Sequence, residues 1–242
     1  MPDISAEPDG CANISSKNKV MGYFDYVAAT GIYSSRDSLY SGFFKERDKH
    51  IADKICSIGR SRLSVLDAGC GDGSGFIRLR EKLKRLEITY RGFDISSEML
   101  EKSRNKGLDV VEGDLVDLRE YPSGSFDVVL SLFGSIGYLS SELERKTAFR
   151  EIRRVLSDDG LLALDVFYRP KEQDCTYSLE ENSPVEGWIH LFSKGQVGEM
   201  LELGGFSVIH CSQHKTVFPM RNKGPKDNLH ELYICKMRSK KE

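Results

Sequence analysis

The residues with the clearest chemical potential form a glycine-rich turn that follows an apolar run. Gly69, Gly71 and Gly73 occupy alternate positions shortly after Asp67. Glycine accepts positive φ angles and allows a ligand to approach the backbone closely. A helix that begins behind such a turn offers unpaired N–H groups and a partial positive charge at its N-terminus. The segment is therefore predicted to bind the polar end of an organic ligand, such as a phosphate or a carboxylate.

Two acidic residues and a serine follow later apolar runs. Asp94 stands about 25 residues beyond Gly69, near the spacing at which a carboxylate meets ribose hydroxyls in nucleotide-binding sheets. Asp114 follows the next apolar run, and Ser131 lies at the end of the one after that. Because the carboxyl ends of parallel strands share one edge of a sheet, we expect these residues to line a single crevice.

The elements that must position these residues alternate between strand and helix. Five strands are predicted by apolar runs, with helical periodicity between most of them, at residues 63–66, 88–93, 108–111, 126–132 and 161–166. Two further runs, 206–211 and 229–235, have no helix between them and are predicted to pair antiparallel. The fold class is therefore α/β, with a doubly wound, mostly parallel seven-stranded sheet and an antiparallel C-terminal strand.

Polar residues mark the predicted starts of three helices. Ser96 is placed to cap a helix that follows the second strand. Ser141 with Glu144, and Ser193 with Gln196, match the capping-box spacing, in which two side chains and two backbone N–H groups bond reciprocally. We therefore expect helices to begin directly after Ser141 and Ser193.

Composition divides the rest of the chain. Residues 1–19 are polar and aperiodic and are predicted to form a flexible tail. Residues 20–242 are predicted to form a single domain, in which residues 20–59 build an N-terminal helical cap. Residues 168–190 show weak periodicity and are predicted to be a lid or an insertion.

The overall composition limits the classes of partner. The net charge is −2, so the chain has no global electrostatic reason to bind nucleic acid or an anionic membrane. The six cysteines and five histidines are scattered, which gives no reason to expect a metal. No apolar run is long enough to span a bilayer. Reduced cysteines and the lack of a signal peptide predict a cytoplasmic protein.

Residues 63–166 resemble the class I, Rossmann-like methyltransferases that depend on S-adenosylmethionine. The first motif of that family resembles Leu-Asp-Ala-Gly-Cys-Gly-Asp-Gly at 66–73, and the second resembles Phe-Asp-Ile-Ser at 93–96. The adenine-binding corner resembles Glu-Gly-Asp-Leu at 112–115, and the fourth strand resembles Phe-Asp-Val-Val at 126–129. The resemblance implies the Rossmann-like methyltransferase fold, methyltransferase activity and S-adenosyl-L-methionine as the cofactor.

The resemblance also implies roles for residues at the methionine and ribose end of the cofactor. The three glycines of the turn would shape the methionine pocket, and Asp67 would hold the turn. Asp94 would accept hydrogen bonds from both ribose hydroxyls. Ser131 would lie near the methionine moiety.

At the adenine end, the resemblance implies that Asp114 accepts a hydrogen bond from the amino group. Met99 and Leu115 would flank the ring, with Ile95 among the cofactor-binding residues. Residues ahead of the first strand often fold over the cofactor in this family, and Tyr26 would take part in that closure. The alternative is that this aromatic segment packs on the sheet edge as an amphipathic helix.

Methyl transfer requires the protein mainly to position the two reacting groups. Transfer from a sulfonium is an in-line displacement, so the protein mainly orients and desolvates the acceptor. A general base is needed only when the acceptor arrives protonated. His190, at the end of the 168–190 segment, is hypothesised to be that base or to orient the acceptor, and a structural role is the alternative.

The acceptor is the least determined part of the reaction. The segment Phe-Gly-Ser-Ile-Gly-Tyr-Leu at 133–139 resembles the corresponding part of small-molecule N-methyltransferases that act on amino sugars and simple amines. A small-molecule acceptor methylated on N or O is favoured, and RNA or protein stays open as the alternative. Basic segments at 221–226 and 236–241 either contact phosphate or form a solvated loop and tail. The oligomeric state is left open.

Two other functions share this type of sheet. An NAD-dependent oxidoreductase would carry Gly or Ala three residues after the second glycine of its fingerprint, where Ser74 stands. A non-catalytic partner subunit would have no need of Asp94 and Asp114 together. Both alternatives are less consistent with the sequence than methyl transfer.

Overall fold

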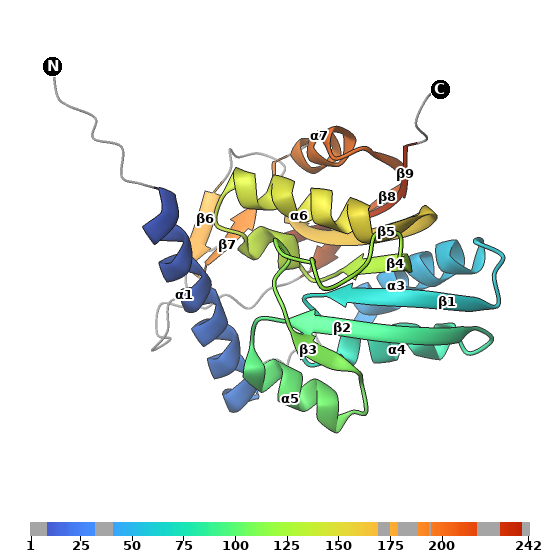
Figure 1. Cartoon of the computed structure of the whole chain (residues 1–242), viewed down its shortest axis with the longest axis horizontal. Coiled ribbons are helices and arrows are strands. Elements are labelled where there is room, and N and C mark those ends of the chain that lie inside the picture. Colours follow the sequence, from blue (N-terminus) through green and yellow to red (C-terminus); the bar gives the residue numbers. More distant parts are fainter. Residues whose placement is uncertain are drawn as a thin grey trace, which may run out of the picture.

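This computed structural model describes residues 9–31, 41–168, 175–178, 188–193, 195–216 and 228–238. In this described part of the chain, seven strands form the central sheet. The strands are β1 (Arg62–Ala68), β2 (Glu87–Asp94), β3 (Val110–Glu112), β4 (Phe126–Ser131), β5 (Leu156–Tyr168), β8 (Phe206–Thr216) and β9 (Asn228–Met237). Their spatial order is β3-β2-β1-β4-β5-β9-β8 (Figure 1). Strands β1 to β5 run parallel, and β9 runs antiparallel to both of its neighbours. The predicted fold class is confirmed.

Helices cover both faces of this sheet (Figure 1). The described helices are α1 (Asp9–Thr30), α3 (Ser41–Cys56), α4 (Ser74–Lys82), α5 (Ser97–Asn105), α6 (Glu142–Val155) and α7 (Gln196–Leu203), with a short 3-10 helix, η1 (Ser135–Tyr138). Side chains of α3, α4 and α5 share one buried cluster with the sheet, and side chains of α6 and α7 share another. The sheet is therefore doubly wound, as its alternating pattern predicts.

The core explains why β4 has an almost unbroken apolar sequence. Val128 and Leu130 belong to the cluster under α3 and α4, whereas Val129 belongs to the cluster under α6 and α7. Successive side chains of a strand point to opposite faces, so a strand covered on both faces must be apolar at every position. β4 lies between β1 and β5, and its last residue leads directly into the ligand-binding edge.

The helix caps follow the sequence in two of three cases. The hydroxyls of Ser96 and Ser141 accept hydrogen bonds from the backbone N–H groups of Met99 and Glu144. At the third helix the expected start is displaced, because α7 begins at Gln196 behind Gly195, whose φ is 86°. The left-handed turn at Gly195 precedes the first helical residue. The Gln196 side chain accepts the backbone N–H of Ser193, which is one of the two hydrogen bonds of the predicted capping box.

The N-terminal helix is longer than composition suggests. α1 begins at Asp9, so residues 9–19, assigned to a tail by their polarity, are helical, while residues 1–8 lie outside the described part. Val20, Tyr23 and Val27 recur on one face of α1 and are buried against the domain. Most helix stability comes from such a packed face, and a helix once nucleated extends cooperatively into less apolar neighbours. α1 packs against α5 beside the carboxyl ends of β1 and β2 (Figure 1).

The 168–190 segment contributes a second, smaller sheet. Its described parts are β6 (Cys175–Ser178) and β7 (Trp188–Leu191), which pair antiparallel. β7 also contacts η1 and β5. Whether this hairpin acts as a lid stays a prediction. Among the described helices, none has the length and apolarity needed to cross a bilayer.

Candidate functional site

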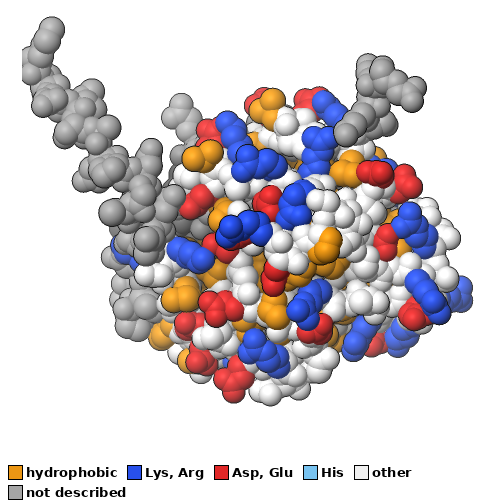
Figure 2. Space-filling view, in the orientation of Figure 1, with side chains coloured by type: hydrophobic (Ala, Val, Ile, Leu, Met, Phe, Trp, Pro, Cys, Tyr) orange, Lys and Arg blue, Asp and Glu red, His pale blue; other side chains and the backbone are white. Residues whose placement is uncertain are grey.

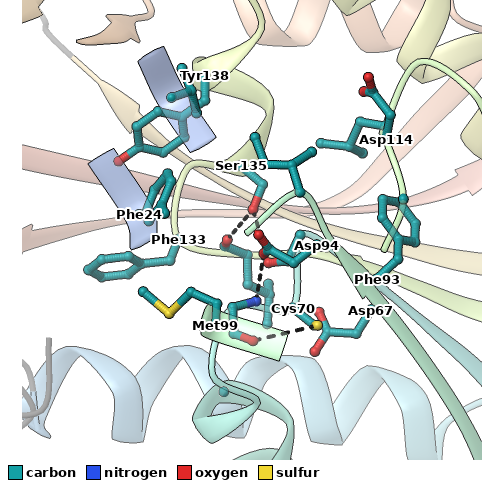
Figure 3. A pocket seen from close by; sticks show the side chains of 18 of the residues that line it. Phe24, Asp67, Cys70, Phe93, Asp94, Met99, Asp114, Phe133, Ser135 and Tyr138 are labelled. Atoms are coloured by element: carbon teal, nitrogen blue, oxygen red, sulfur yellow. Dashed lines mark hydrogen bonds between the residues drawn. The ribbon is translucent and has the colours of Figure 1, made fainter. Parts of the chain in front are cut away.

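A cavity of about 1330 Å³, its open mouth included, lies at the carboxyl ends of β1 to β4 (Figure 3). Its wall includes Asp67 from β1, Asp94 from β2, Asp114 beyond β3, and Leu132 and Phe133 beyond β4. The predicted crevice is therefore present as one continuous space.

The glycine-rich turn forms the floor of this cavity at the start of α4. Gly69, Gly71 and Gly73 have φ angles of 79°, 54° and 76°, which L side chains rarely adopt. A Cβ on Gly69 would lie 2.6 Å from the Ser135 hydroxyl, whereas a Cβ on Gly71 would meet open space. Gly69 and Gly71 line the cavity, but Gly73 packs beneath α4 against Leu108 and does not. The turn thus needs glycine both for its backbone and for close packing.

Asp94 is bonded to the turn. Its carboxylate accepts the backbone N–H of Gly71 at 2.8 Å and that of Ser96 at 3.0 Å, one on each oxygen. Burial raises the pKa of Asp94 above its ordinary value, although these backbone donors oppose the rise. Each carboxylate oxygen can accept a second hydrogen bond, so Asp94 retains acceptor capacity toward the cavity.

Asp67 is more deeply buried than Asp94, with 4% of its surface exposed. Burial raises the pKa of Asp67 to about 7, while a hydrogen bond from the Tyr90 hydroxyl at 3.2 Å lowers it. Tyr90 stacks on Phe76 of α4 at a centroid distance of 3.9 Å. Asp67 therefore ties the turn to β2, and an ionised Asp67 would favour a positive charge in the cavity.

Asp114 forms the opposite end of the cavity, where its carboxylate pairs with the ammonium group of Lys17 at 2.7 Å. Its other oxygen accepts the backbone N–H of Val116. No sequence pattern indicates Lys17 as a site residue, because this residue falls in the stretch that is predicted to be a tail. Apolar side chains between the two ends could flank a flat ring: Phe93, Ile95, Met99 and Leu115.

The remaining wall is aromatic. Phe24 and Tyr138 meet edge to face at 4.9 Å, and Phe44 and Phe133 lie 5.7 Å apart. In the view of Figure 3, Phe24, Phe133 and Tyr138 lie on one side of the cavity and Asp114 on the other. Phe133 has a φ of 57°, an unusual value for a bulky side chain.

Two arginines also reach the cavity. The Arg47 guanidinium donates to Asp165 at 2.8 Å and to Asp48 at 2.8 Å, and all three side chains are buried. Burial lowers the pKa of Arg47, but the two carboxylates outweigh this effect and raise it. Arg78 lies over the ring of Phe44 at 3.9 Å and 3.5 Å from Asp48. Residues 32–40, which also contain an arginine, lie outside the described part.

Besides Gly73, three residues expected at the site do not line the cavity. Tyr26 packs with Tyr23 and Val27 behind Met99, because residues two apart on a helix point in different directions; Phe24 reaches the cavity instead. Ser131 is fully buried within the sheet. His190 on β7 is 6% exposed and meets the ring of Phe192 at 4.7 Å. A catalytic role for His190 has no support from its position.

The described residues contain no group of three or more His, Cys, Asp or Glu side chains arranged to hold a metal ion. Within the same part of the chain, Cys56, Cys70, Cys211 and Cys235 are free thiols.

Comparison with known proteins decides the family. Residues 65–160 match the family model described as a methyltransferase domain. A protein from Encephalitozoon cuniculi that is named as a methyltransferase is 31% identical over 174 residues, covering 66% of this chain and 78% of its own. The chain belongs to the class I S-adenosylmethionine-dependent methyltransferases. Its cofactor is S-adenosylmethionine.

Other relatives of this methyltransferase act on different acceptors. A dTDP-3-amino-3,4,6-trideoxy-alpha-D-glucopyranose N,N-dimethyltransferase from Streptomyces venezuelae is 29% identical over 56% of this chain and 56% of its own length. A tRNA (carboxymethyluridine(34)-5-O)-methyltransferase from Arabidopsis thaliana is 31% identical over 52% of this chain and 30% of its own. The chain therefore spans about half or less of these two proteins.

A solved structure shares the fold of the methyltransferase over almost its whole length. The 1,6-didemethyltoxoflavin-N1-methyltransferase of Burkholderia thailandensis, solved with 1,6-didemethyltoxoflavin and S-adenosylhomocysteine, has a TM-score of 0.69. The match covers 98% of this chain and 94% of that chain at 15% identity. At this identity the similarity concerns the fold alone.

Proposed function

We propose that this methyltransferase methylates an N or O atom of a small-molecule acceptor. The observation that carries the proposal is the enclosure of the cavity by α1. Lys17 of α1 pairs with Asp114 at 2.7 Å, and Asp25 of α1 accepts the Ser96 hydroxyl at 2.6 Å. These two contacts hold the helix over the loops that follow β2 and β3. An acceptor must therefore fit within the space that the cofactor leaves, which favours a small molecule.

The cavity supports one orientation of the cofactor. Asp94 would accept the ribose hydroxyls on its remaining lone pairs, and the open side of Gly71 would lie against the methionine portion. Asp114 would accept the adenine amino group beside Lys17, with Met99 and Leu115 on the two sides of the ring. This orientation is supported by hydrogen-bond acceptors at both ends of the cavity and by apolar side chains between them. These assignments remain predictions.

The chain's own residues would then position and desolvate the acceptor. When bound, S-adenosylmethionine supplies a methyl group activated by a sulfonium centre. The faces of Phe24, Phe133 and Tyr138 favour a cationic or planar group at the acceptor end. Lys17, Val20 and Phe24 of α1 cover part of the cavity and would limit the access of water to the bound acceptor, which would strengthen charge interactions there.

Surface charge gives less support to an RNA acceptor. Many described cations are already paired with acids, such as Arg91 with Asp109 and Lys146 with Glu142. On the face shown in Figure 2, basic and acidic side chains alternate and do not gather into a single basic patch. A groove for RNA would need unpaired cations along a track.

Two measurements test the proposal. Thermal unfolding with S-adenosylhomocysteine, NAD and NADP should show a shift with the first ligand alone, of about 5–10 °C at a concentration near 100 times Kd. Release of S-adenosylhomocysteine should then be measured with amino sugars, simple amines and hydroxylated aromatics, and with total tRNA in parallel. Turnover with tRNA but with none of the small molecules would overturn the proposed acceptor class.

A further inference from the structure

A buried histidine lies next to the cavity, outside the residues that line it. His230 on β9 has no exposed surface, and its Nδ1 lies 2.9 Å from Oδ1 of Asp165 on β5. The second oxygen of Asp165 accepts the Arg47 guanidinium at 2.8 Å. Arg47 lines the cavity. A continuous chain of hydrogen bonds therefore links the cavity wall to His230.

The partner of Nδ1 determines what the other ring nitrogen can do. Burial alone would raise the pKa of Asp165, but His230 and Arg47 lower it to about 2, so Asp165 is ionised near neutral pH. An ionised carboxylate accepts a proton donor, which places the N–H of a neutral His230 on Nδ1 and a lone pair on Nε2. That Nε2 is buried and has no hydrogen-bond partner among the described residues. A buried acceptor without a donor costs free energy unless a ligand supplies the donor.

Aromatic rings surround His230 and separate it from the cavity. The rings of Phe167, Phe43 and Phe133 lie 4.2, 4.5 and 5.6 Å from its own. Of these, Phe133 also lines the cavity, so this one ring borders the cavity and also packs on the imidazole.

The backbone at Phe133 is strained, and the residue that follows it is bonded to the backbone of Asp165. Phe133 has a φ of 57°, and among the described residues it is the one non-glycine residue with a positive φ. The next residue, Gly134, donates its N–H to the backbone carbonyl of Asp165 at 3.0 Å. A Cβ on Gly134 would overlap the ring of Phe167. Strain of this kind persists where the surroundings enforce it, and it is concentrated at functional sites.

From this arrangement we propose that His230 is the general base of the methyl transfer, that Asp165 and Arg47 position it, and that Phe133 gates its access to the acceptor. The inference rests on the proposed function and adds a residue to its mechanism. Nε2 of His230 takes the proton from the acceptor N–H or O–H, and the acceptor lone pair forms the bond to the methyl carbon. The electron pair of the broken carbon–sulfur bond remains on sulfur. The imidazolium is stabilised by Asp165 and later releases its proton to water.

The charged groups around His230 are compatible with this role. Arg47 faces the network from α3, and Asp165 faces it from β5. From β8, His214 lies opposite His230 in the strand pairing and meets the ring of Phe43 at 5.5 Å. His214 is in turn 3.4 Å from Glu46. Asp165 is thus the acid in direct contact with the His230 ring in the described structure.

The first test needs no acceptor. Diethyl pyrocarbonate labels unprotonated imidazole nitrogens, and mass spectrometry gives the rate at each histidine. Phe133→Gly removes the gate and suits the positive φ, so His230 should label at least tenfold faster than in the wild type. His50 on α3 and His210 on β8 are half-buried, and their rings lie 4.6 Å apart, so they serve as internal references whose rates should not change. Equal His230 rates in the two proteins, with normal labelling of the references, would overturn the gate.

The second test uses the best acceptor from the turnover screen. His230→Gln should lower kcat by at least 100-fold and leave the affinity for S-adenosylhomocysteine within threefold, with His210→Gln as the matched control. The acid limb of the wild-type kcat/KM profile should be absent, and added imidazole should restore part of the turnover of His230→Ala. Retention of kcat within threefold in His230→Gln overturns this inference alone. Failure of the wild type to bind S-adenosylhomocysteine would overturn the proposed function instead.

Discussion

The ammonium group of Lys17 lies 2.7 Å from the carboxylate of Asp114, although 97 positions separate the two residues in the chain. The contact joins α1 to the loop behind β3 at the end of the cavity where we propose that the adenine binds. Its side chains are 50% and 21% exposed, so the pair adds little to global stability, about 0–1 kcal/mol. Its importance lies in positioning the helix.

Lys17→Ala should therefore loosen α1 without unfolding the domain. We expect amide exchange in α1 to accelerate at least fivefold, while Tm falls by less than about 3 °C. Hydrogen exchange followed by mass spectrometry gives both the site and the rate. Lys146→Ala, which breaks an exposed pair with Glu142 on α6, is the matched control. Exchange that is unchanged in α1 would show that apolar packing alone holds the helix.

Asp94→Asn should weaken cofactor binding. The variant keeps an oxygen for the N–H of Gly71 but loses the charge that ligand hydroxyls would meet, so Kd for S-adenosylhomocysteine should rise about 10- to 100-fold. Titration calorimetry measures this directly. Asp117→Asn, which breaks only an exposed pair with Arg119, should bind as the wild type does. Equal affinities of the two variants would remove Asp94 from the site.

Ionisation of Asp67 should lower the free energy of unfolding of the ligand-free protein as the pH rises. The pKa of Asp67 is raised from 3.8 to about 7, so between these values the folded chain holds a proton that the unfolded chain has lost. The free energy of unfolding should therefore fall through this window, by up to about 1.4 kcal/mol per pH unit, and level off above it. Asp67→Asn stays neutral, so its stability relative to the wild type should increase from pH 5 to pH 8. Urea unfolding at both pH values checks the sign, and a constant difference would contradict it.

Gly69→Ala should destabilise the protein more than Gly59→Ala. Both glycines have positive φ, 79° and 75°, so each substitution carries a backbone cost of about 1–2 kcal/mol. A Cβ on Gly59 meets nothing within 4 Å, whereas one on Gly69 would lie 2.6 Å from the Ser135 hydroxyl. Denaturant unfolding should show at least about 1 kcal/mol of extra loss for Gly69→Ala, together with loss of cofactor binding. Equal losses would mean that Ser135 moves aside freely.

Local patterns were sufficient for the fold and for the acidic corners of the site. The unbroken apolar run of β4 reflects burial on both faces, and the hydroxyls of Ser96 and Ser141 mark helix starts because capping is a contact within one turn. Asp67, Asp94 and Asp114 line one cavity because parallel strands place their carboxyl ends at one edge of the sheet. Each of these features depends on a residue's near neighbours or on the rule that connects strand to helix.

Only the tertiary structure decided which side chains meet from distant parts of the chain. Periodicity marks the buried face of a helix, but it does not say that Phe24 reaches the cavity while Tyr26 packs behind Met99. The Arg47, Asp165 and His230 network joins α3, β5 and β9, and no spacing in the sequence relates them. Such contacts depend on the spatial order of the strands and on where each helix docks. Those are set by packing of the whole core, which no local segment of the sequence contains.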